Sequence, residues 1–560
     1  MQDPVALAGL FQQGLAHHQR GQREEAKVAY ERMLVLQPGH PDALHMLGVI
    51  ALQVGNSALA AELISIALQN NPLNASAHHN LGLALQELQR FEEAIVSFTQ
   101  AVSIKEDYAQ AIFNRGLALH AAGRLDRALA DFDKTIELQP HDAQAWNSRG
   151  VVLQDQLRWD EAVQSYAAAI AAQPAYAQAY YNQGNALLEA GRFEAALASY
   201  DAAIGLQADW AHALNNRGLA LQELQRSHEA IESYDAAIAS KPDYADAYWN
   251  KAIELLLCGD FAQGWKLYEW RWRRDTFSSR KRDFLRPLWL GDAPLDGKTV
   301  LLHAEQGLGD SIQFCRYARE VAALGAEILL EVPRPLMALF ETLEGVKHLV
   351  EKGSALPHFD FHCPLLSLPL AFQTQLTKLP STSTYLASTA SKRDLWQSHL
   401  GPPSKPRIGL VWSGNARDKN DLQRSMTLNS LLPYLPHCFE YICLQKELRA
   451  ADHDAMQANP IRFFGSQIQD FSDTAALCDL MDLVISVDTS VAHLAGALGK
   501  PTWIMLPYAP DWRWMRDRDD SPWYPSARLY RQGKDRSWLP VLERIASDLI
   551  GYGHSRIPKR

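Results

Sequence analysis

The chain has 560 residues, more than one hydrophobic core usually holds, so we expect two to four folding units. Hydrophobic residues make up 47% of it and charged residues 21%, which is ordinary for a globular protein. The formal net charge of −10 gives no reason to expect a nucleic acid as a partner.

The six cysteines never lie closer than five residues apart, so no CxxC pair or zinc-finger spacing is present. So few thiols indicate a reducing compartment. The first residues lack the basic and then apolar pattern of a secretory signal, and no uninterrupted apolar run of about 18 residues predicts a membrane span. We therefore expect a cytoplasmic protein without a membrane span.

A 34-residue period runs through the N-terminal half. Ala252 marks the eighth register, and glycine marks the first seven: Gly14, Gly48, Gly82, Gly116, Gly150, Gly184 and Gly218. A small residue follows each register position by twelve residues and a bulky one by sixteen, as Ala26 and Tyr30 do in the first unit. Proline closes five units: Pro38, Pro72, Pro140, Pro174 and Pro242. This pattern predicts pairs of closely crossing helices that end at proline.

The spacing resembles the tetratricopeptide repeat family. The resemblance implies an all-α superhelix of about eight repeats, with a concave groove that binds a polypeptide. Asparagine stands two residues before the register position in five repeats: Asn80, Asn114, Asn182, Asn216 and Asn250. A row of side-chain amides could pair with a peptide backbone, and it resembles the asparagine row of the protein O-GlcNAc transferases. The alternative is that asparagine is simply common at this repeat position.

An aromatic cluster ends the array: Trp265, Tyr268, Trp270 and Trp272. A basic stretch, 271–282, overlaps it. Because a terminal repeat must cover exposed core, the cluster predicts a cap over the last repeat, with a ligand surface as the alternative. The register is lost by Pro287, and we assign residues 1–274 to the repeats.

The remaining chain alternates apolar strands with helical segments, which predicts an α/β fold with parallel sheets. The expected strands are 298–303, 327–332, 407–413, 440–444, 461–464, 483–487 and 502–506. Proline-containing stretches at 377–391 and 401–406 indicate a linker between two lobes. We therefore expect two doubly wound lobes, 275–390 and 391–560, that face each other across a cleft.

The first strand-end loop, 306–310, reads Gln-Gly-Leu-Gly-Asp. Gly307 and Gly309 would let the backbone approach a ligand, and Asp310 would begin a helix. Its carboxylate could act as a general base that takes the proton of an acceptor hydroxyl. Taken alone, a helix N-cap is the simpler interpretation of Asp310.

Two further loops suit phosphate. Residues 412–415 precede Arg417, Lys419 and Arg424, and such cations suit a pyrophosphate, although a solvated charged loop would look the same. Residues 486–493 close a buried strand and open a helix whose N–H and hydroxyl groups could cradle phosphate. There Asp488 would orient a sugar hydroxyl or hold the loop, His493 would donate to ribose or phosphate, and a structural cap is the alternative.

Together, the Gly-Asp loop and the Asp-Thr-Ser-Val-Ala-His motif resemble the heptosyltransferase-like group of GT-B glycosyltransferases, over about residues 298–550. The resemblance implies two Rossmann-like lobes and an inverting, metal-independent transfer from a nucleotide sugar, with Asp310 as the base. Ser490 departs from the usual glycine of that group, which alters the room around the donor phosphates. The candidate donor-binding residues are Gly307, Gly309, Asn415, Lys419, Arg424, Gln445, Lys446, Asp488, Thr489, Ser490 and His493.

The combination of repeats with a GT-B-like C-terminal half resembles the protein O-glycosyltransferases. This resemblance implies a polypeptide acceptor in the groove. We expect a sugar to be transferred to Ser or Thr. A heptosyltransferase-like reaction on lipopolysaccharide or another glycan, and a non-enzymatic scaffold, stay open as alternatives. No Asp-x-Asp motif stands at a strand end, so we expect no metal and no other cofactor. A homo-oligomer is compatible with the sequence.

Overall fold

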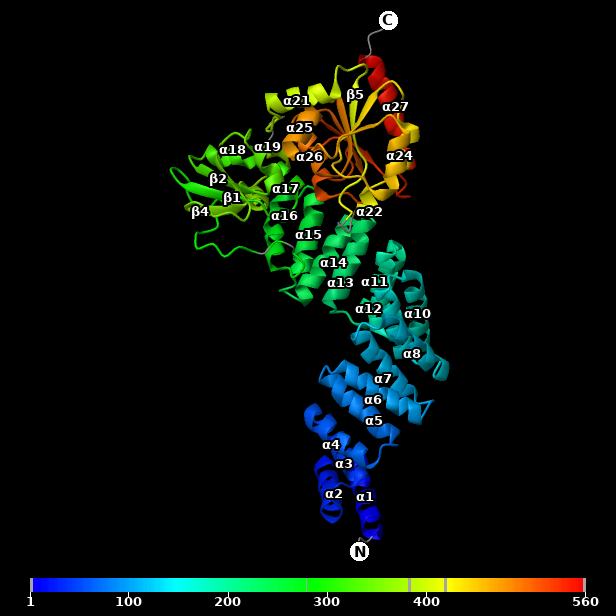
Figure 1. Ribbon diagram of the computed structural model, residues 1–560. Coiled ribbons are helices and arrows are strands. Elements are labelled where there is room, and N and C mark those ends of the chain that lie inside the picture. The colour runs from blue at the N-terminus through cyan, green and yellow to red at the C-terminus, as the bar shows by residue number, and fades with distance from the viewer. Residues whose placement is uncertain (1–3, 278, 280, 381–383, 417–420, 557–560) are drawn as a thin grey trace. The chain divides into compact units, whose positions relative to one another are not determined.

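The computed structural model describes residues 4–277, 279, 281–380, 384–416 and 421–556. Two compact units divide the chain, Met1–Ala220 and Leu221–Arg560. Figure 1 shows helices throughout the first unit, and the second unit contains further helices and both sheets.

Antiparallel helix pairs form the repeats, two helices to each 34-residue period. They are α1 (Pro4–Gln19), α2 (Arg23–Leu36), α3 (Pro41–Gln53), α4 (Ser57–Asn70), α5 (Ala75–Glu87), α6 (Phe91–Ile104), α7 (Ala109–Ala121), α8 (Leu125–Leu138), α9 (Ala143–Asp155), α10 (Trp159–Ala172), α11 (Ala177–Glu189), α12 (Phe193–Leu206), α13 (Ala211–Glu223), α14 (Ser227–Ser240), α15 (Ala245–Leu257) and α16 (Phe261–Tyr268). Each of the five prolines lies two residues beyond the end of a second helix, as the sequence predicts.

The register glycines are required by the helix crossing. A Cβ added to Gly82 would lie 2.5 Å from the Phe98 ring, and one added to Gly150 would lie 2.6 Å from the Tyr166 ring. Both rings are fully buried. The side chain sixteen residues after the register therefore fills the space that glycine leaves, and the predicted packing is confirmed.

The first sheet is parallel, in the order β3-β2-β1-β4. Its strands are β1 (Thr299–His303), β2 (Glu327–Val332), β3 (Val346–Glu351) and β4 (Phe361–Pro364). Helices α17 (Leu308–Phe314) and α18 (Tyr317–Ala322) share a core with one face, whereas Leu301 and Leu329 on the other face pack with Phe284 and Phe359 of connecting segments. The sequence did not predict β3, which is mostly half-exposed, or β4, which has four residues.

The second sheet is also parallel, in the order β10-β9-β8-β5-β6-β7. Its strands are β5 (Arg407–Val411), β6 (Glu440–Cys443), β7 (Arg462–Phe463), β8 (Leu483–Val487), β9 (Thr502–Leu506) and β10 (Ala527–Arg531). Helices α25 (Phe471–Asp479) and α26 (Ser490–Ala497) lie on one face, and α24 (His453–Ala458) and α27 (Leu539–Arg556) lie on the other (Figure 1). This sheet has helices on both faces, as expected. The linker helix is α21 (Ala390–Leu400).

The last repeat shares a hydrophobic core with the first sheet. Trp265 is 2% exposed and packs edge-on against Trp512, with ring centroids 5.2 Å apart, and against Phe314 at 6.3 Å. Leu256, Leu257 and the strand residues of β1 belong to the same core. The aromatic cluster therefore covers the end of the array, and the boundary expected after residue 274 stays a prediction.

Candidate functional site

The three candidate loops follow strands that stand at the topological switch point of each sheet, where the order of the strands along the chain reverses. In the second sheet, chain order runs outward from β5 on one side and from β8 on the other, and the loops 412–415 and 486–493 follow these two strands. In the first sheet, the reversal lies between β1 and β4, and the loop 306–310 follows β1. Ligands of open α/β sheets bind at such switch points, beyond the carboxyl ends of the strands.

One cavity of about 910 Å³ brings the candidate residues together. The lining includes every predicted donor-binding residue except Lys419, which lies outside the described residues. It also includes Tyr268 of the aromatic cluster and side chains that the sequence did not mark as candidates: Trp249, Ile253, Gln469, Asp470, Phe471, Asp511, Trp512 and Arg513. Residues from the last repeat, from the first sheet and from the second sheet therefore meet at one site.

Asp310 is the third residue of α17, because the helix begins at Leu308 with Gly307 as its N-cap. The expected N-cap role is therefore corrected: the Gly307 backbone N–H donates to Asp310 Oδ2 at 3.1 Å, so Asp310 stabilises the turn from inside the helix. Arg513 Nη2 donates to its Oδ1 at 2.5 Å. Burial raises the pKa of Asp310, and the Arg513 guanidinium opposes that shift. The side chain lines the cavity with 20% of its surface exposed and with both oxygens engaged.

Gly309 is the point where the two sheets approach each other. A Cβ on this residue would lie 2.9 Å from Cδ2 of His493 and 3.5 Å from Cα of Ser490. The missing side chain thus allows the loop after β1 to contact helix α26, a role that the sequence analysis did not anticipate for Gly309.

His493 is buried beside the cavity. Its Nδ1 lies 3.0 Å from the Tyr524 hydroxyl, and its ring stacks on the Trp514 indole with centroids 5.1 Å apart. Burial lowers the pKa of His493 well below its usual range, and Arg513 lowers it further. A neutral imidazole can still donate one hydrogen bond to a ligand, but without the strength that a positive charge would add.

Asp488 directly follows β8, at the beginning of the turn that leads to α26, and has 13% of its side chain exposed. One of its oxygens lies 3.9 Å from His493 Nε2. Burial raises the pKa of Asp488 to about 6, and the nearby Asp511 carboxylate adds to the shift. Thr489 is the N-cap of α26, but its side chain makes no capping hydrogen bond and instead lies 3.1 Å from the Ser486 hydroxyl.

Arg513 is the principal cation that sequence reasoning missed. Its side chain is 10% exposed and donates to Asp511 at 2.9 Å and to the Gln313 side-chain oxygen at 2.8 Å, in addition to Asp310. It comes from η7 (Trp512–Trp514), in the segment between β9 and β10. The sequence carries a signal for it, since strand 502–506 is predicted and the loop after it contains Asp-Trp-Arg-Trp with a cation beside a carboxylate.

Gln445 is engaged with its own lobe. Its side-chain oxygen accepts from the backbone N–H groups of Trp412, at 2.8 Å, and Ser413, at 3.2 Å. Its amide nitrogen donates to the Ser413 hydroxyl at 3.1 Å. Gln445 therefore holds the loop after β5 in place, so its contribution to nucleotide binding stays a prediction. The exposed Lys446 donates to the Gln469 carbonyl at 3.0 Å.

Arg424 belongs to α22 (Asp421–Arg424) and lies 3.7 Å from Asp421, a buried carboxylate that also pairs with Arg449. Part of its charge is therefore compensated within the protein. The Ser425 hydroxyl donates to Asp421 at 2.8 Å and accepts from the Gly414 N–H at 2.9 Å, which fixes the loop on which Arg424 stands.

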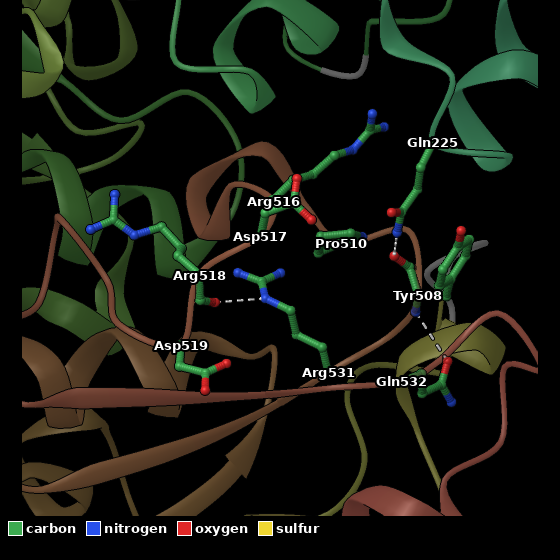
Figure 2. Close-up of a pocket in the computed structure, with 9 residues that line it drawn as sticks. All are labelled: Gln225, Tyr508, Pro510, Arg516, Asp517, Arg518, Asp519, Arg531 and Gln532. Carbon is green, nitrogen blue, oxygen red and sulfur yellow. Dashed lines mark hydrogen bonds between the residues drawn. The ribbon is translucent and has the colours of Figure 1, made fainter.

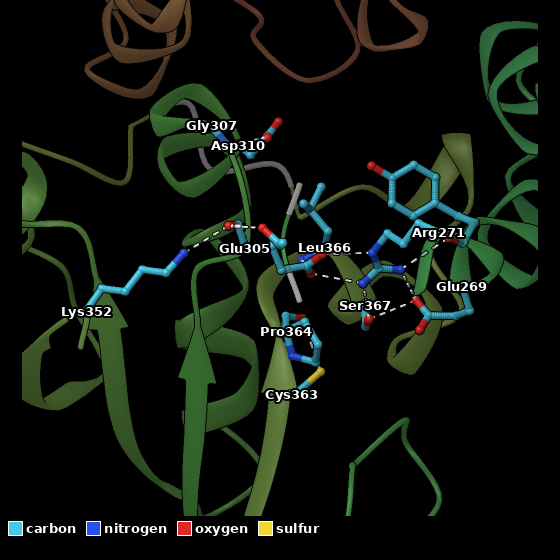
Figure 3. A network of polar contacts seen from close by, with 12 residues as sticks. Glu269, Arg271, Glu305, Gly307, Asp310, Lys352, Cys363, Pro364, Leu366 and Ser367 are labelled. Carbon is cyan, nitrogen blue, oxygen red and sulfur yellow. Dashed lines mark hydrogen bonds and ion pairs between the residues drawn. The ribbon is translucent and has the colours of Figure 1, made fainter. Parts of the chain in front are cut away.

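A buried ion pair supports the loop after β1 (Figure 3). Arg271, fully buried just after the last repeat, donates to both oxygens of Glu305 at 2.8 and 2.9 Å and to the Ser367 hydroxyl at 2.7 Å. Lys352 donates to the Glu305 carbonyl at 3.0 Å. The basic stretch 271–282 therefore contains the residue that anchors the segment leading to Gly307.

The asparagine row of the repeats makes contacts between neighbouring repeats. In each case the amide nitrogen reaches a polar side chain that lies 35 residues earlier: Asn80 to His45 at 2.9 Å, Asn114 to His79 at 2.9 Å, Asn182 to Asn147 at 3.0 Å and Asn216 to Tyr181 at 3.3 Å. Where Ser148 interrupts the row, the partner position holds Phe113. These amides thus have a structural role, and their binding of a peptide, like that of Asn250, stays a prediction.

A second cavity, of about 580 Å³, lies against the segment between β9 and β10 (Figure 2). It is lined by Gln225, Tyr508, Pro510, Arg516, Asp517, Arg518, Asp519, Arg531 and Gln532. Arg516 pairs with Glu254 at 3.0 Å and Arg518 with Asp520 at 2.7 Å, so two of its three cations are compensated by carboxylates.

Within the described part of the chain, no group of three or more His, Cys, Asp or Glu side chains is arranged to hold a metal ion. The same residues contain no helix that is long and apolar enough to cross a membrane.

Comparison with known proteins identifies the repeats. The tetratricopeptide repeat model matches residues 11–75, 45–110, 79–143, 113–156, 148–213 and 215–263. Protein FlbA of Caulobacter vibrioides is 26% identical over 338 residues, which cover 54% of this chain and 55% of FlbA. The type IV pilus assembly protein PilF of Pseudomonas aeruginosa is 35% identical over 91 residues, 16% of this chain and 36% of PilF. The chain thus spans about half the length of FlbA and less of PilF.

Among solved structures, YrrB, a TPR protein with an unusual peptide-binding site, is 21% identical and covers 33% of this chain and 96% of its own, with a TM-score of 0.30. The sequence matches agree with the glycine register and with the helix pairs of the structure. Residues 11–263 of this protein are tetratricopeptide repeats.

Proposed function

We propose that the protein is a glycosyltransferase of the GT-B type, which transfers a sugar from a nucleotide sugar to Ser or Thr of a polypeptide that the repeats bind. The observation that carries the proposal is the single cavity on which the loops after β1, β5 and β8 converge from two parallel sheets. Glycosyl transfer needs a base near the acceptor and an anion site near the leaving group, and this cavity has candidates for both.

The proposed reaction is an inverting displacement. The acceptor hydroxyl oxygen attacks the anomeric carbon, the bond from that carbon to the phosphate oxygen breaks, and the nucleotide (a nucleoside diphosphate, or CMP from a CMP-sugar) leaves with the bonding electrons. Asp310 accepts the hydroxyl proton, for which its raised pKa suits it. Positive charge on Arg513 keeps Asp310 ionised until the proton arrives.

The donor phosphates would lie at the start of α26. The first turn of that helix presents the backbone N–H groups of Ser490 and Val491, and Arg424 lines the same cavity. The described lining carries carboxylates from Asp310, Glu447, Asp470, Asp488 and Asp511 and cations from Arg424, Lys446 and Arg513, so the donor must bind close to the cations. The raised pKa of Asp488 reduces its repulsion of phosphate at mildly acidic pH.

Donor turnover in the presence of EDTA tests the proposal. Purified protein would be incubated with UDP-, GDP- and CMP-activated sugars, and release of the free nucleotide would be measured with and without EDTA. We expect turnover of one donor class to persist in EDTA, because the positive groups that stabilise the leaving phosphate belong to the protein. Turnover that requires added magnesium or manganese would contradict the metal-independent mechanism.

A second candidate is a non-enzymatic assembly scaffold. Two observations favour it. Both Asp310 oxygens are engaged, by Gly307 and Arg513, as they would be in a purely structural helix cap. In addition, 91 residues of the chain are similar to PilF, a pilus assembly protein. Failure of every donor to turn over, together with an unaffected partner interaction in an Asp310→Asn variant, would support the scaffold.

A further inference from the structure

The wall of the cavity next to Asp310 is aromatic and aliphatic. Trp249 and Ile253 project from one face of α15, four residues apart, and both line the cavity. The Trp249 and Tyr268 rings lie 4.6 Å apart, and Tyr268 lies 6.3 Å from Trp512. Trp512 in turn directly precedes Arg513, the partner of Asp310.

Trp249 occupies a special position in the repeat pattern. In earlier repeats the equivalent residues contact the asparagine of the following repeat, as His45, His79, Asn147 and Tyr181 do. Within the described residues no repeat follows α16, so position 249 has no asparagine of a following repeat to contact. An indole stands there instead and lines the cavity.

The cations near this wall are paired with carboxylates, so the wall itself is apolar. The Arg271 guanidinium behind it is fully buried and bound to Glu305 and Glu269, and Arg274, which lies 5.1 Å from the Trp249 ring, is paired with Asp246 at 2.6 Å. A ligand group at this wall would therefore gain by burying apolar surface, not by forming an ion pair.

We propose that Trp249, Ile253 and Tyr268 form an acceptor subsite that takes an aromatic or branched apolar side chain adjacent to the hydroxyl that is modified. The inference rests on the proposed function, because it assigns Asp310 to the hydroxyl. It adds the substrate class: a serine or threonine flanked by an apolar residue, in a segment that passes along the last repeat.

Peptide binding to the full-length protein tests the subsite. Fluorescein-labelled nonapeptides with a central serine would be titrated by fluorescence polarisation, in one series with Leu or Phe beside the serine and in another with Asp or Lys. We expect the apolar series to bind about tenfold tighter, the effect of one well-buried aromatic contact. Trp249→Ala should remove this difference, and Trp249→Phe should keep part of it.

The matched control is Trp159→Ala, a half-buried tryptophan at the start of α10 that does not line the cavity. It should keep the full preference. Equal binding of the two series, no binding of either, or an unchanged preference in Trp249→Ala would each overturn the subsite.

The same peptides, incubated with the UDP-, GDP- and CMP-activated sugars and analysed by mass spectrometry, separate the two proposals. Apolar preference in binding without any sugar transfer would remove the proposed reaction and keep the subsite. Transfer of sugar to both peptide series at equal rates would remove the subsite and keep the proposed reaction.

Discussion

At the scale of single residues, the contact between Arg513 and Asp310 sets how basic the candidate base can be. Burial alone raises the pKa of Asp310, and the adjacent guanidinium counteracts part of this effect. Arg513 is held in turn by Asp511 and Gln313. Its position, and therefore the charge next to Asp310, is fixed by three side chains.

Substitution of Arg513 should move the pH dependence of turnover. Arg513→Gln removes the charge that lowers the pKa of Asp310, so the acidic limb of the rate profile should shift to higher pH. Arg513→Lys keeps a charge at the same place and should shift the limb less. Asp310→Asn should reduce the rate by about 10²–10⁴-fold at pH values above the acidic limb and should remove the limb itself. Initial rates of donor consumption from pH 4.5 to 8 measure all three, and an unshifted limb in Arg513→Gln would show that Asp310 does not control it.

Asp488 should destabilise the protein at neutral pH. The pKa of the folded state, about 6, lies above that of an unfolded aspartate, so the cost is absent below pH about 4, grows between these values and is complete above pH 6. Asp488→Asn should therefore raise the stability of its lobe by about 3 kcal/mol at pH 7.5 and by little at pH 4. Thermal unfolding at the two pH values tests this, and an equal effect at both would mean that the carboxylate is not strained by burial.

At the scale of elements, the segment between β9 and β10 contacts both the candidate site and the last helices of the repeats. Asp511 and Arg513 line the candidate site, whereas Arg516, three residues on, reaches helices α14 and α15. There it donates to Ser227 and pairs with Glu254, which is fully buried, at 3.0 Å. Burial raises the pKa of Glu254, so the charge on Arg516 is needed to keep that carboxylate ionised.

Removal of Arg516 should loosen this segment. Arg516→Met leaves Glu254 buried without its cation, which costs about 3–5 kcal/mol for such pairs. Amide hydrogen exchange should become faster in residues 508–519 and in α15. Arg518→Met is the matched control, because its pair with Asp520 is largely exposed and is worth at most about 1 kcal/mol. Equal protection in both variants would show that the buried pair does not hold the segment.

At the scale of the whole molecule, the last repeat folds with the α/β half rather than with the array alone. Leu256, Phe261 and Trp265 belong to the same hydrophobic core as strands of the first sheet. The compact unit accordingly begins at Leu221. In the array before it, each helix from α1 to α12 packs against its neighbours in sequence.

Truncation should distinguish these parts. A chain that begins at residue 207 keeps α13 to α16 and should stay folded and hydrolyse donor slowly, while losing modification of a polypeptide acceptor. A chain that begins at residue 275 exposes the partners of Trp265 and should aggregate or melt at a lower temperature. Size-exclusion chromatography, thermal melting and acceptor labelling measure the outcomes. A stable 275–560 fragment would show that the last repeat is dispensable, and full acceptor labelling by 207–560 would contradict a role of the array in recruitment.

The sequence by itself determined the features that repeat or alternate. A 34-residue period with glycine, alanine and an aromatic at fixed offsets can be satisfied by one local packing, in which Gly82 meets Phe98 and Gly150 meets Tyr166. Strands β1, β5, β8 and β9 were predictable because they are almost wholly buried and therefore apolar. Strands β3, β4 and β10 were not, since β3 is half-exposed, β4 has only four residues, and two arginines interrupt the apolar residues of β10.

Tertiary structure alone decided which residues share the site, which partners they contact and which of them have shifted pKa values. Asp310 and Arg513 lie 203 positions apart, and Arg271 and Glu305 come from different folding elements, so no local pattern could pair them. Helix α17 begins two residues before Asp310, which turns an expected N-cap into a capping-box residue with a second partner. The protonation of His493 and Asp488 likewise depends on burial and on charges from distant segments, because desolvation acts through space and not along the chain.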